Sequence, residues 1–206
     1  MPLVDVALPA FDDAPFPSPV RALLDESAQR IEAFLGRRGG DPVPGFVPAD
    51  FDRIYRALRA IAAGNLAPGD SFCEWGSGFG VVALLATHLD FHACGIEIQP
   101  ELVEEAESLA AAVGLEVEFV CGTLVPPAGQ ELTDVPQEFA WLSAGGACGH
   151  ELLGVEPADF DLIFAYPWPG EEGVIEDLFE RFAATSALLL TYHGYEDLRL
   201  RRKVDE

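Results

Sequence analysis

The sequence predicts a doubly wound α/β fold, with a mostly parallel sheet, helices on both faces and an N-terminal helical extension. Short apolar runs rich in branched and aromatic residues alternate with helical stretches; the runs are residues 71–75, 91–98, 115–121, 160–166 and 186–192. The helical stretches are residues 81–88, 101–113 and 172–184. Strands that alternate with helices indicate βαβ units and therefore a parallel sheet. We expect the extension to span residues 1–66 and the α/β domain residues 67–206.

Two amphipathic helices account for most of the expected extension. The first begins at Ser18 and Pro19, a frequent helix start, and stops at a pair of glycines near residue 40. A Pro- and Gly-rich connector leads to the second, in which five apolar residues share one face: Phe51, Ile54, Tyr55, Leu58 and Ile61. We expect the opposite face, with Arg53, Arg56 and Arg59, to be solvated.

Charge and composition narrow the possible partners. The 206-residue chain has a formal net charge of −23, and no Lys or Arg occurs between Ala60 and Glu180. A surface with this excess of negative charge repels phosphate backbones, which disfavours nucleic acid as a partner. The sequence leaves open whether the charge attracts a cationic partner or only maintains solubility, and it leaves the oligomeric state open.

Membrane insertion and metal binding are not expected. No apolar run has the length of a membrane span, and the N-terminus lacks the pattern of a signal peptide, so we expect a cytoplasmic protein. The four cysteines form no C-x-x-C pair and are expected to be buried, reduced thiols. We expect no bound metal.

A glycine-rich turn indicates a ligand site. Gly76, Gly78 and Gly80 lie between the strand 71–75 and the helix that follows it. Glycine lets the backbone approach a ligand closely, and in open α/β sheets this turn borders the ligand crevice. Glu97 ends the next strand, about twenty residues on, where a carboxylate can accept hydrogen bonds from two ribose hydroxyls.

The spacing of the glycines separates two cofactors. A dinucleotide loop has the pattern G-x-G-x-x-G, but Val81 stands where its third glycine would be. The observed pattern is acid-x-Gly-x-Gly-x-Gly, from Glu74 to Gly80. We therefore expect a cofactor that carries a ribose but needs no pyrophosphate clamp.

This pattern, with Glu97, resembles the S-adenosylmethionine site of class I methyltransferases, whose fold is Rossmann-like. The resemblance covers residues 71 to about 192 and implies that Gly76 and Gly78 flank the methionine part of the cofactor. It also implies that Glu74 holds the ammonium group and Glu97 the ribose. The implied cofactor-binding set is Glu74, Gly76, Ser77, Gly78, Gly80, Glu97, Ile98, Gly122 and Thr123. Gly122 and Thr123 replace the acidic residue that usually faces adenine, so that contact must come from backbone groups or the Thr123 hydroxyl.

The acceptor side is predicted at the end of the run 160–166. Ala165-Tyr166-Pro167-Trp168 partly resembles the (Asn/Asp)-Pro-Pro-aromatic motif of amino-directed methyltransferases, although Ala165 lacks the polar side chain. Aromatic walls attract cations, and a nearby carboxylate can take a proton from an amine. The predicted catalytic residues are Tyr166, Pro167, Trp168, Glu171 and Glu172. His193 is also expected near this edge, as a structural residue or a proton shuttle.

The sequence thus favours methyl transfer from S-adenosylmethionine to an amine of a protein or small molecule, and it leaves a small carboxylate or hydroxyl compound open as the substrate. Two alternatives remain, a regulatory module that binds the cofactor without turnover and an NAD-dependent oxidoreductase. Few residues follow the last predicted strand, so we expect a shortened C-terminal edge of the sheet or an N-terminal helix that covers it. The stretch 123–159 reads as an insertion that covers a site or has structure of its own.

Overall fold

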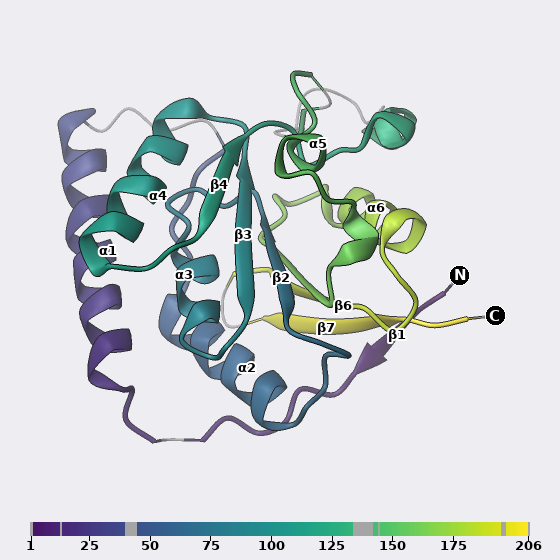
Figure 1. Cartoon of the computed structure of the whole chain (residues 1–206), viewed down its shortest axis with the longest axis horizontal. Coiled ribbons are helices and arrows are strands. Elements are labelled where there is room, and N and C mark those ends of the chain that lie inside the picture. Colours follow the sequence, from purple (N-terminus) through teal and green to yellow (C-terminus); the bar gives the residue numbers. More distant parts are fainter. Residues whose placement is uncertain are drawn as a thin grey trace.

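A computed structural model describes residues 2–12, 14–39, 45–133, 142–143, 145–194 and 197–205. Within these residues a seven-stranded sheet has the order β1-β7-β6-β5-β2-β3-β4 (Figure 1). Its parallel part consists of β2 (Ser71–Trp75), β3 (His92–Glu97), β4 (Glu118–Cys121), β5 (Leu162–Ala165) and β6 (Leu188–Tyr192). These strands fall within the five apolar runs, and the predicted α/β fold is confirmed.

The helices cover both faces of the sheet. On one side lie α1 (Ser18–Arg37), α2 (Phe51–Ala63), α3 (Val81–Thr87) and α4 (Pro100–Val113), and on the other α5 (Gly149–Leu153) and α6 (Glu172–Phe182) (Figure 1). The central strands β2, β5 and β6 are covered on both faces, so their side chains are almost all buried, as in other parallel sheets. This explains why the strands read as continuous apolar runs.

The C-terminal edge of the sheet takes a form that the sequence pattern did not indicate. A single strand, β7 (Leu198–Lys203), follows β6 in antiparallel orientation, and the N-terminal strand β1 (Leu3–Val6) then pairs with β7. In this register Asp5 lies opposite Arg201, whose Nε is 3.2 Å from the Asp5 carboxylate. A strand from the N-terminus, rather than a helix, therefore completes the edge.

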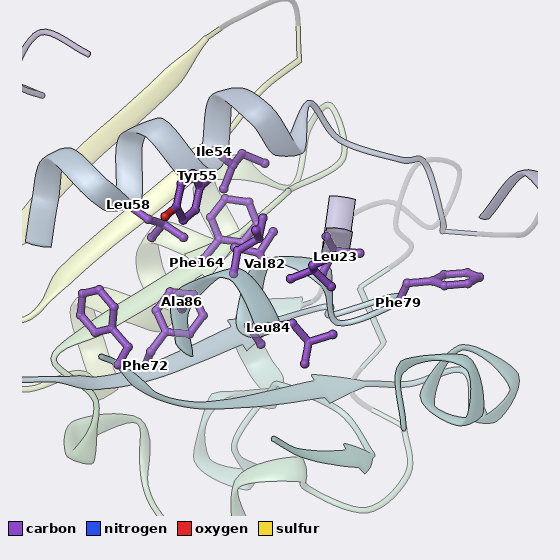
Figure 2. Packing of buried hydrophobic residues seen from close by; sticks show 14 of the residues in the cluster. Leu23, Ile54, Tyr55, Leu58, Phe72, Phe79, Val82, Leu84, Ala86 and Phe164 are labelled. Carbon is purple, nitrogen blue, oxygen red and sulfur yellow. The ribbon is translucent and has the colours of Figure 1, made fainter. Parts of the chain in front are cut away.

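The N-terminal helices pack directly onto the α/β part. Leu23 of α1 and Ile54 and Leu58 of α2 belong to one buried cluster with α3 and the sheet residues Phe72 and Phe164 (Figure 2). The division into an extension of residues 1–66 and a domain of residues 67–206 stays a proposal from the sequence. In the structure, β1 joins the sheet of the domain, and α1 and α2 share its hydrophobic core.

The arginines of α2 do not form the simple solvated face that we expected. Arg56 and Arg59 lie over the Phe16 ring at 4.6 and 5.8 Å from its centroid, and Arg53 lies 5.5 Å from the centroid of Phe11. Cation–π contacts of this kind contribute about 0.5–1 kcal/mol each at exposed sites. The arginines thus hold the segment that joins β1 to α1 against α2.

The predicted insertion has structure of its own in the part that the structure describes. It contains the 3-10 helices Pro127–Thr133 and Pro157–Asp159 and the helix α5, whereas residues 134–141 and 144 lie outside the described residues. Thr123 forms an isolated parallel bridge with Cys148, which ties the residues just before α5 to the end of β4. The insertion is therefore anchored at the edge where the predicted site lies.

His150 makes the stability of the fold sensitive to acid. The ring is 2% exposed, between Trp75 and Phe160, and burial lowers its pKa to about 4. The unfolded chain takes up a proton near pH 6.5 and the folded one only near pH 4, so stability is lost across this window. We expect that His150 accounts for a decrease of about 3 kcal/mol in the free energy of unfolding between pH 7 and pH 4.

Urea denaturation of the His150→Phe variant over this pH range tests the assignment. The variant should lose less stability on acidification than the wild type. Parallel profiles for the wild type and His150→Phe would show that His150 is not the responsible group.

Within the described ranges, no helix is both long and apolar enough to span a membrane.

Candidate active site

The glycine loop joins β2 to α3 at the carboxyl edge of the sheet. The N–H groups of Gly76 and Ser77 both donate to the carbonyl of Ile96 in β3, at 2.9 and 3.0 Å, which fixes the turn against the neighbouring strand. Gly78 has φ +53, and a Cβ there would lie 2.8 Å from the Phe46 ring. The loop therefore requires glycine where the connector before α2 crosses it.

Glu97 lies at the end of β3 and is bonded to the loop. One carboxylate oxygen accepts from the Gly78 N–H at 2.8 Å, and the other accepts from the Gln99 N–H at 2.9 Å. Burial raises the pKa of Glu97, and the backbone hydrogen bonds partly offset this effect. Each oxygen has a second lone pair, so this fixed carboxylate can accept hydrogen bonds from a diol.

Glu74, in β2, is buried beneath the loop with 4% exposure. Its Oε2 accepts a hydrogen bond of 2.8 Å from the Ala83 N–H in the first turn of α3. Burial raises the pKa of this carboxyl well above its usual range, and the charge of Glu97 raises it further. An unpaired buried carboxylate is unfavourable, so the site favours a cationic ligand group beside Glu74.

Replacing Glu74 should make the protein without ligand more stable at neutral pH. The folded pKa of Glu74 lies above 4.5, so above this pH the unfolded chain releases the proton first and stability falls. Glu74→Gln removes this loss and can still accept from Ala83, so its advantage over the wild type should grow as the pH rises from 4 to 7. Chemical denaturation at each pH measures the difference. The exposed Glu104→Gln is the control, and an advantage that is constant with pH would contradict the burial argument.

Two adjoining cavities, each of about 260 Å³, lie along this edge. The loop cavity is lined among others by Phe46, Glu74, Gly76, Ser77, Gly78, Glu172 and His193. The insertion cavity is lined among others by Ile98, Gly122, Thr123, Leu142 and Glu171. Both cavities are lined by Gly45, Gly76, Glu97, Tyr166, Pro167 and Trp168. Glu97 thus stands where the two cavities meet, and together they match the size of a small-molecule site.

Most of the predicted cofactor residues line these cavities, and two need comment. Gly80 lines neither cavity. A Cβ at this position would clash with the Phe119 ring, so the glycine is required for packing. The Thr123 hydroxyl donates to the Ser143 carbonyl at 2.5 Å and accepts from the Val125 N–H at 3.1 Å. Because this hydroxyl is already engaged, the geometry favours backbone groups for the predicted adenine contact.

The structure separates the two carboxylates predicted on the acceptor side. Glu172 lines the loop cavity, and its Oε2 accepts from the Gly170 N–H at 2.7 Å. Glu171 lines the insertion cavity, where its Oε1 accepts from the Leu142 N–H at 2.7 Å. Glu171 therefore holds the insertion, and of this pair only Glu172 faces the loop cavity. Tyr166, Pro167 and Trp168 line both cavities, as expected for a central wall.

Sequence reasoning missed the wall supplied by the connector before α2. The Phe46 ring lies 5.4 Å from that of Phe79, and the Trp168 indole N–H donates to the Gly45 carbonyl at 3.3 Å. Val47 and Phe51 also line the loop cavity. The Pro- and Gly-rich composition of this segment signals a linker, and nothing local in it indicates contact with a strand end more than a hundred residues away.

Among the described residues, no three or more His, Cys, Asp or Glu side chains gather in a way that could hold a metal ion.

The fold is shared with methyltransferases of known structure. The chain superposes on a methyltransferase from Geobacter sulfurreducens with a TM-score of 0.52 and 15% identity, covering 93% of each chain. It matches an O-methyltransferase from Bacillus cereus in complex with S-adenosylhomocysteine at TM-score 0.52 and 13% identity, over 87% of this chain and 67% of that one. The chain has the class I methyltransferase fold. A third structure with this fold is an RNA methyltransferase from Salinibacter ruber in complex with S-adenosylhomocysteine, with a TM-score of 0.51 and 17% identity over 78% and 95% of the chains.

Part of the sequence is also similar to a curated methyltransferase. A segment of 84 residues is 38% identical to the ribosomal protein L11 methyltransferase of Thermus thermophilus. The match covers 41% of this chain and spans only a third of the length of that relative. No protein-family model matches the chain.

Proposed function

We propose that the protein is an S-adenosylmethionine-dependent methyltransferase that acts on an amine nitrogen. The observation that carries the proposal is the Glu97 carboxylate, bonded to the glycine loop where the two cavities meet. A ribose bound there leaves the insertion cavity for the adenine and the loop cavity for the methionine part. The methyltransferase fold and the curated relative support the same cofactor.

The side chains of the loop cavity fit this cofactor. The Ser77 hydroxyl is buried, has no hydrogen-bond partner within the described residues and belongs to a residue that lines the cavity. A buried hydroxyl without a partner is unfavourable, and a carboxylate or ammonium group of a ligand would satisfy it. An ammonium group bound beside Glu74 would favour the ionised form of this buried carboxyl, and the two charges would then pair. When bound, S-adenosylmethionine supplies an electrophilic methyl group on a sulfonium.

The lining of the loop cavity favours an amine acceptor. It contains Glu74 and Glu172, the aromatic side chains of Tyr166 and Trp168, and no Lys or Arg among the described residues. Aromatic faces and carboxylates attract a cationic group, and the same surroundings disfavour an acceptor that carries a phosphate. The walls can align the acceptor and exclude water, which is most of what a protein contributes to an in-line displacement.

Proteins and small amines both remain candidate acceptors. The name of the curated relative favours a protein, whereas solved structures with this fold include RNA and O-methyltransferases. The net charge of −23 favours a cationic protein segment over RNA.

Calorimetry followed by a methyl-release assay tests the proposal. We expect S-adenosylmethionine and S-adenosylhomocysteine to bind and NAD to give no heat, and we expect turnover with lysine-containing peptides or alkylamines rather than with RNA. Binding of NAD in place of S-adenosylmethionine would exclude the proposal. Tight binding of the cofactor with no turnover on peptides, amines, hydroxylated compounds or RNA would instead favour a regulatory module.

A further inference from the structure

A proton acceptor is needed in the loop cavity if the substrate is an amine. At neutral pH an alkylamine arrives as an ammonium ion, whose nitrogen has no free lone pair until it loses a proton. Glu171 faces the insertion cavity, and one oxygen of Glu172 is bonded to the backbone of Gly170. His193 stands just beyond the end of β6 and lines the loop cavity, as Tyr166 and Glu172 also do.

We propose that His193 takes the proton from the acceptor nitrogen and that Thr191 positions its imidazole ring. This inference rests on the proposed function. The backbone of His193 is fixed because its N–H donates to the Asp197 carbonyl at 2.9 Å. Its ring is fixed because Nε2 lies 2.8 Å from the hydroxyl oxygen of Thr191, a buried residue of β6. Nδ1 is the ring nitrogen that Thr191 does not contact.

The surroundings of His193 suit a proton acceptor at neutral pH. Burial lowers the pKa of His193 and Arg199 of β7 lowers it further, while Asp197 and the α6 residues Glu172 and Glu176 raise it. The net direction is downward from 6.5, so the imidazole is neutral at pH 7. The three nearby carboxylates then stabilise the imidazolium that forms, as a general base requires.

The acceptor nitrogen must lose a proton before it can attack the methyl group. One proton passes from the ammonium nitrogen to Nδ1 of His193, which leaves a neutral amine and an imidazolium. The freed lone pair forms the bond to the methyl carbon, and the electron pair of the broken carbon–sulfur bond stays on sulfur. The imidazolium then returns its proton to water.

Sinefungin tests this assignment without knowledge of the acceptor. It is an analogue of S-adenosylmethionine with a primary amine in place of the sulfonium methyl, so its ammonium group points to the acceptor side. A hydrogen bond from an ammonium group to a neutral imidazole corresponds to a preference of about 10-fold or more over S-adenosylhomocysteine. We expect calorimetry at pH 7.5 to show this preference, and we expect it to decline in acid, once the pH falls through the lowered pKa of His193 and the imidazole becomes protonated.

Variants distinguish His193 from the rest of the cavity. His193→Leu should lose the sinefungin preference and keep its affinity for S-adenosylhomocysteine, His193→Gln should keep part of the preference without its pH dependence, and the exposed His92→Gln is the control. Thr191→Val should weaken the preference and shift the His193 pKa measured by NMR. With an amine acceptor, His193→Gln should lower kcat about 100-fold or more.

Different outcomes would contradict the role of His193 and the proposed methyltransferase function. A sinefungin preference that survives in His193→Leu, with S-adenosylhomocysteine still bound, would overturn the role of His193 alone. A wild-type protein that binds neither compound would overturn the proposed function.

Discussion

Glu97→Gln is expected to weaken S-adenosylmethionine binding about 100-fold, because hydrogen bonds to a charged group contribute about 1.5–3 kcal/mol each and two ribose hydroxyls lose a charged acceptor. The amide keeps one acceptor oxygen, so it can still bond to Gly78 or to Gln99, but not to both. The loop should therefore also become less well ordered. Calorimetry with S-adenosylhomocysteine measures the affinity directly.

A matched control separates this effect from charge alone. Glu118 lies in the edge strand β4 and is exposed, and Glu118→Gln removes the same charge outside both cavities. We expect its affinity to remain within about 2-fold of that of the wild type, because exposed charges are screened by salt. If Glu97→Gln behaved like this control while the protein remained folded, the ribose would have to bind elsewhere.

Gly80→Ala is expected to destabilise the protein by about 3 kcal/mol or more, through backbone strain and overpacking. Gly80 has φ +67 at the start of α3, and an added Cβ would lie 2.3 Å from atoms of the Phe119 ring. Phe119 is buried beside α3 and α4, so the ring has little room to withdraw. Urea denaturation measures the change in the free energy of unfolding.

The chain provides a control with the same backbone but no clash. Gly114, at the end of α4, has φ +70 and no heavy atom within 4 Å of an added Cβ. Gly114→Ala should therefore show the strain alone, about 1–2 kcal/mol. Equal destabilisation by the two substitutions would mean that Phe119 moves aside and that Gly80 is required only for its φ.

The parallel sheet could be predicted because its strands carry their own signal. A strand such as β2 is buried on both faces, so Phe72, Cys73 and Trp75 all contribute to an apolar run that is visible locally. The strand β1 has only four residues, one of them Asp5, and its partner β7 lies almost two hundred residues further along the chain. The residues around β1 and β7 therefore give no local signal that these two strands pair.

The same distinction explains which part of the candidate site was foreseen. Glu74, the glycines and Glu97 lie close together in the sequence, at the ends of adjacent strands, and their spacing alone defines a cradle. Phe46 and His193 join them only through the packing of the connector and the end of β6. The separation of Glu171 from Glu172 was also hidden, because adjacent residues at a helix start can face different cavities.

The pairing of β1 with β7 also determines when the sheet can be completed during synthesis. β1 precedes the rest of the described fold in the chain, whereas its partner Leu198–Lys203 follows the other strands and helices. Contacts of such long sequence separation form late, because the chain must close a long loop before they stabilise it. Until β7 is made, β1 lacks its partner strand and the edge of β6 stays open to association with other chains.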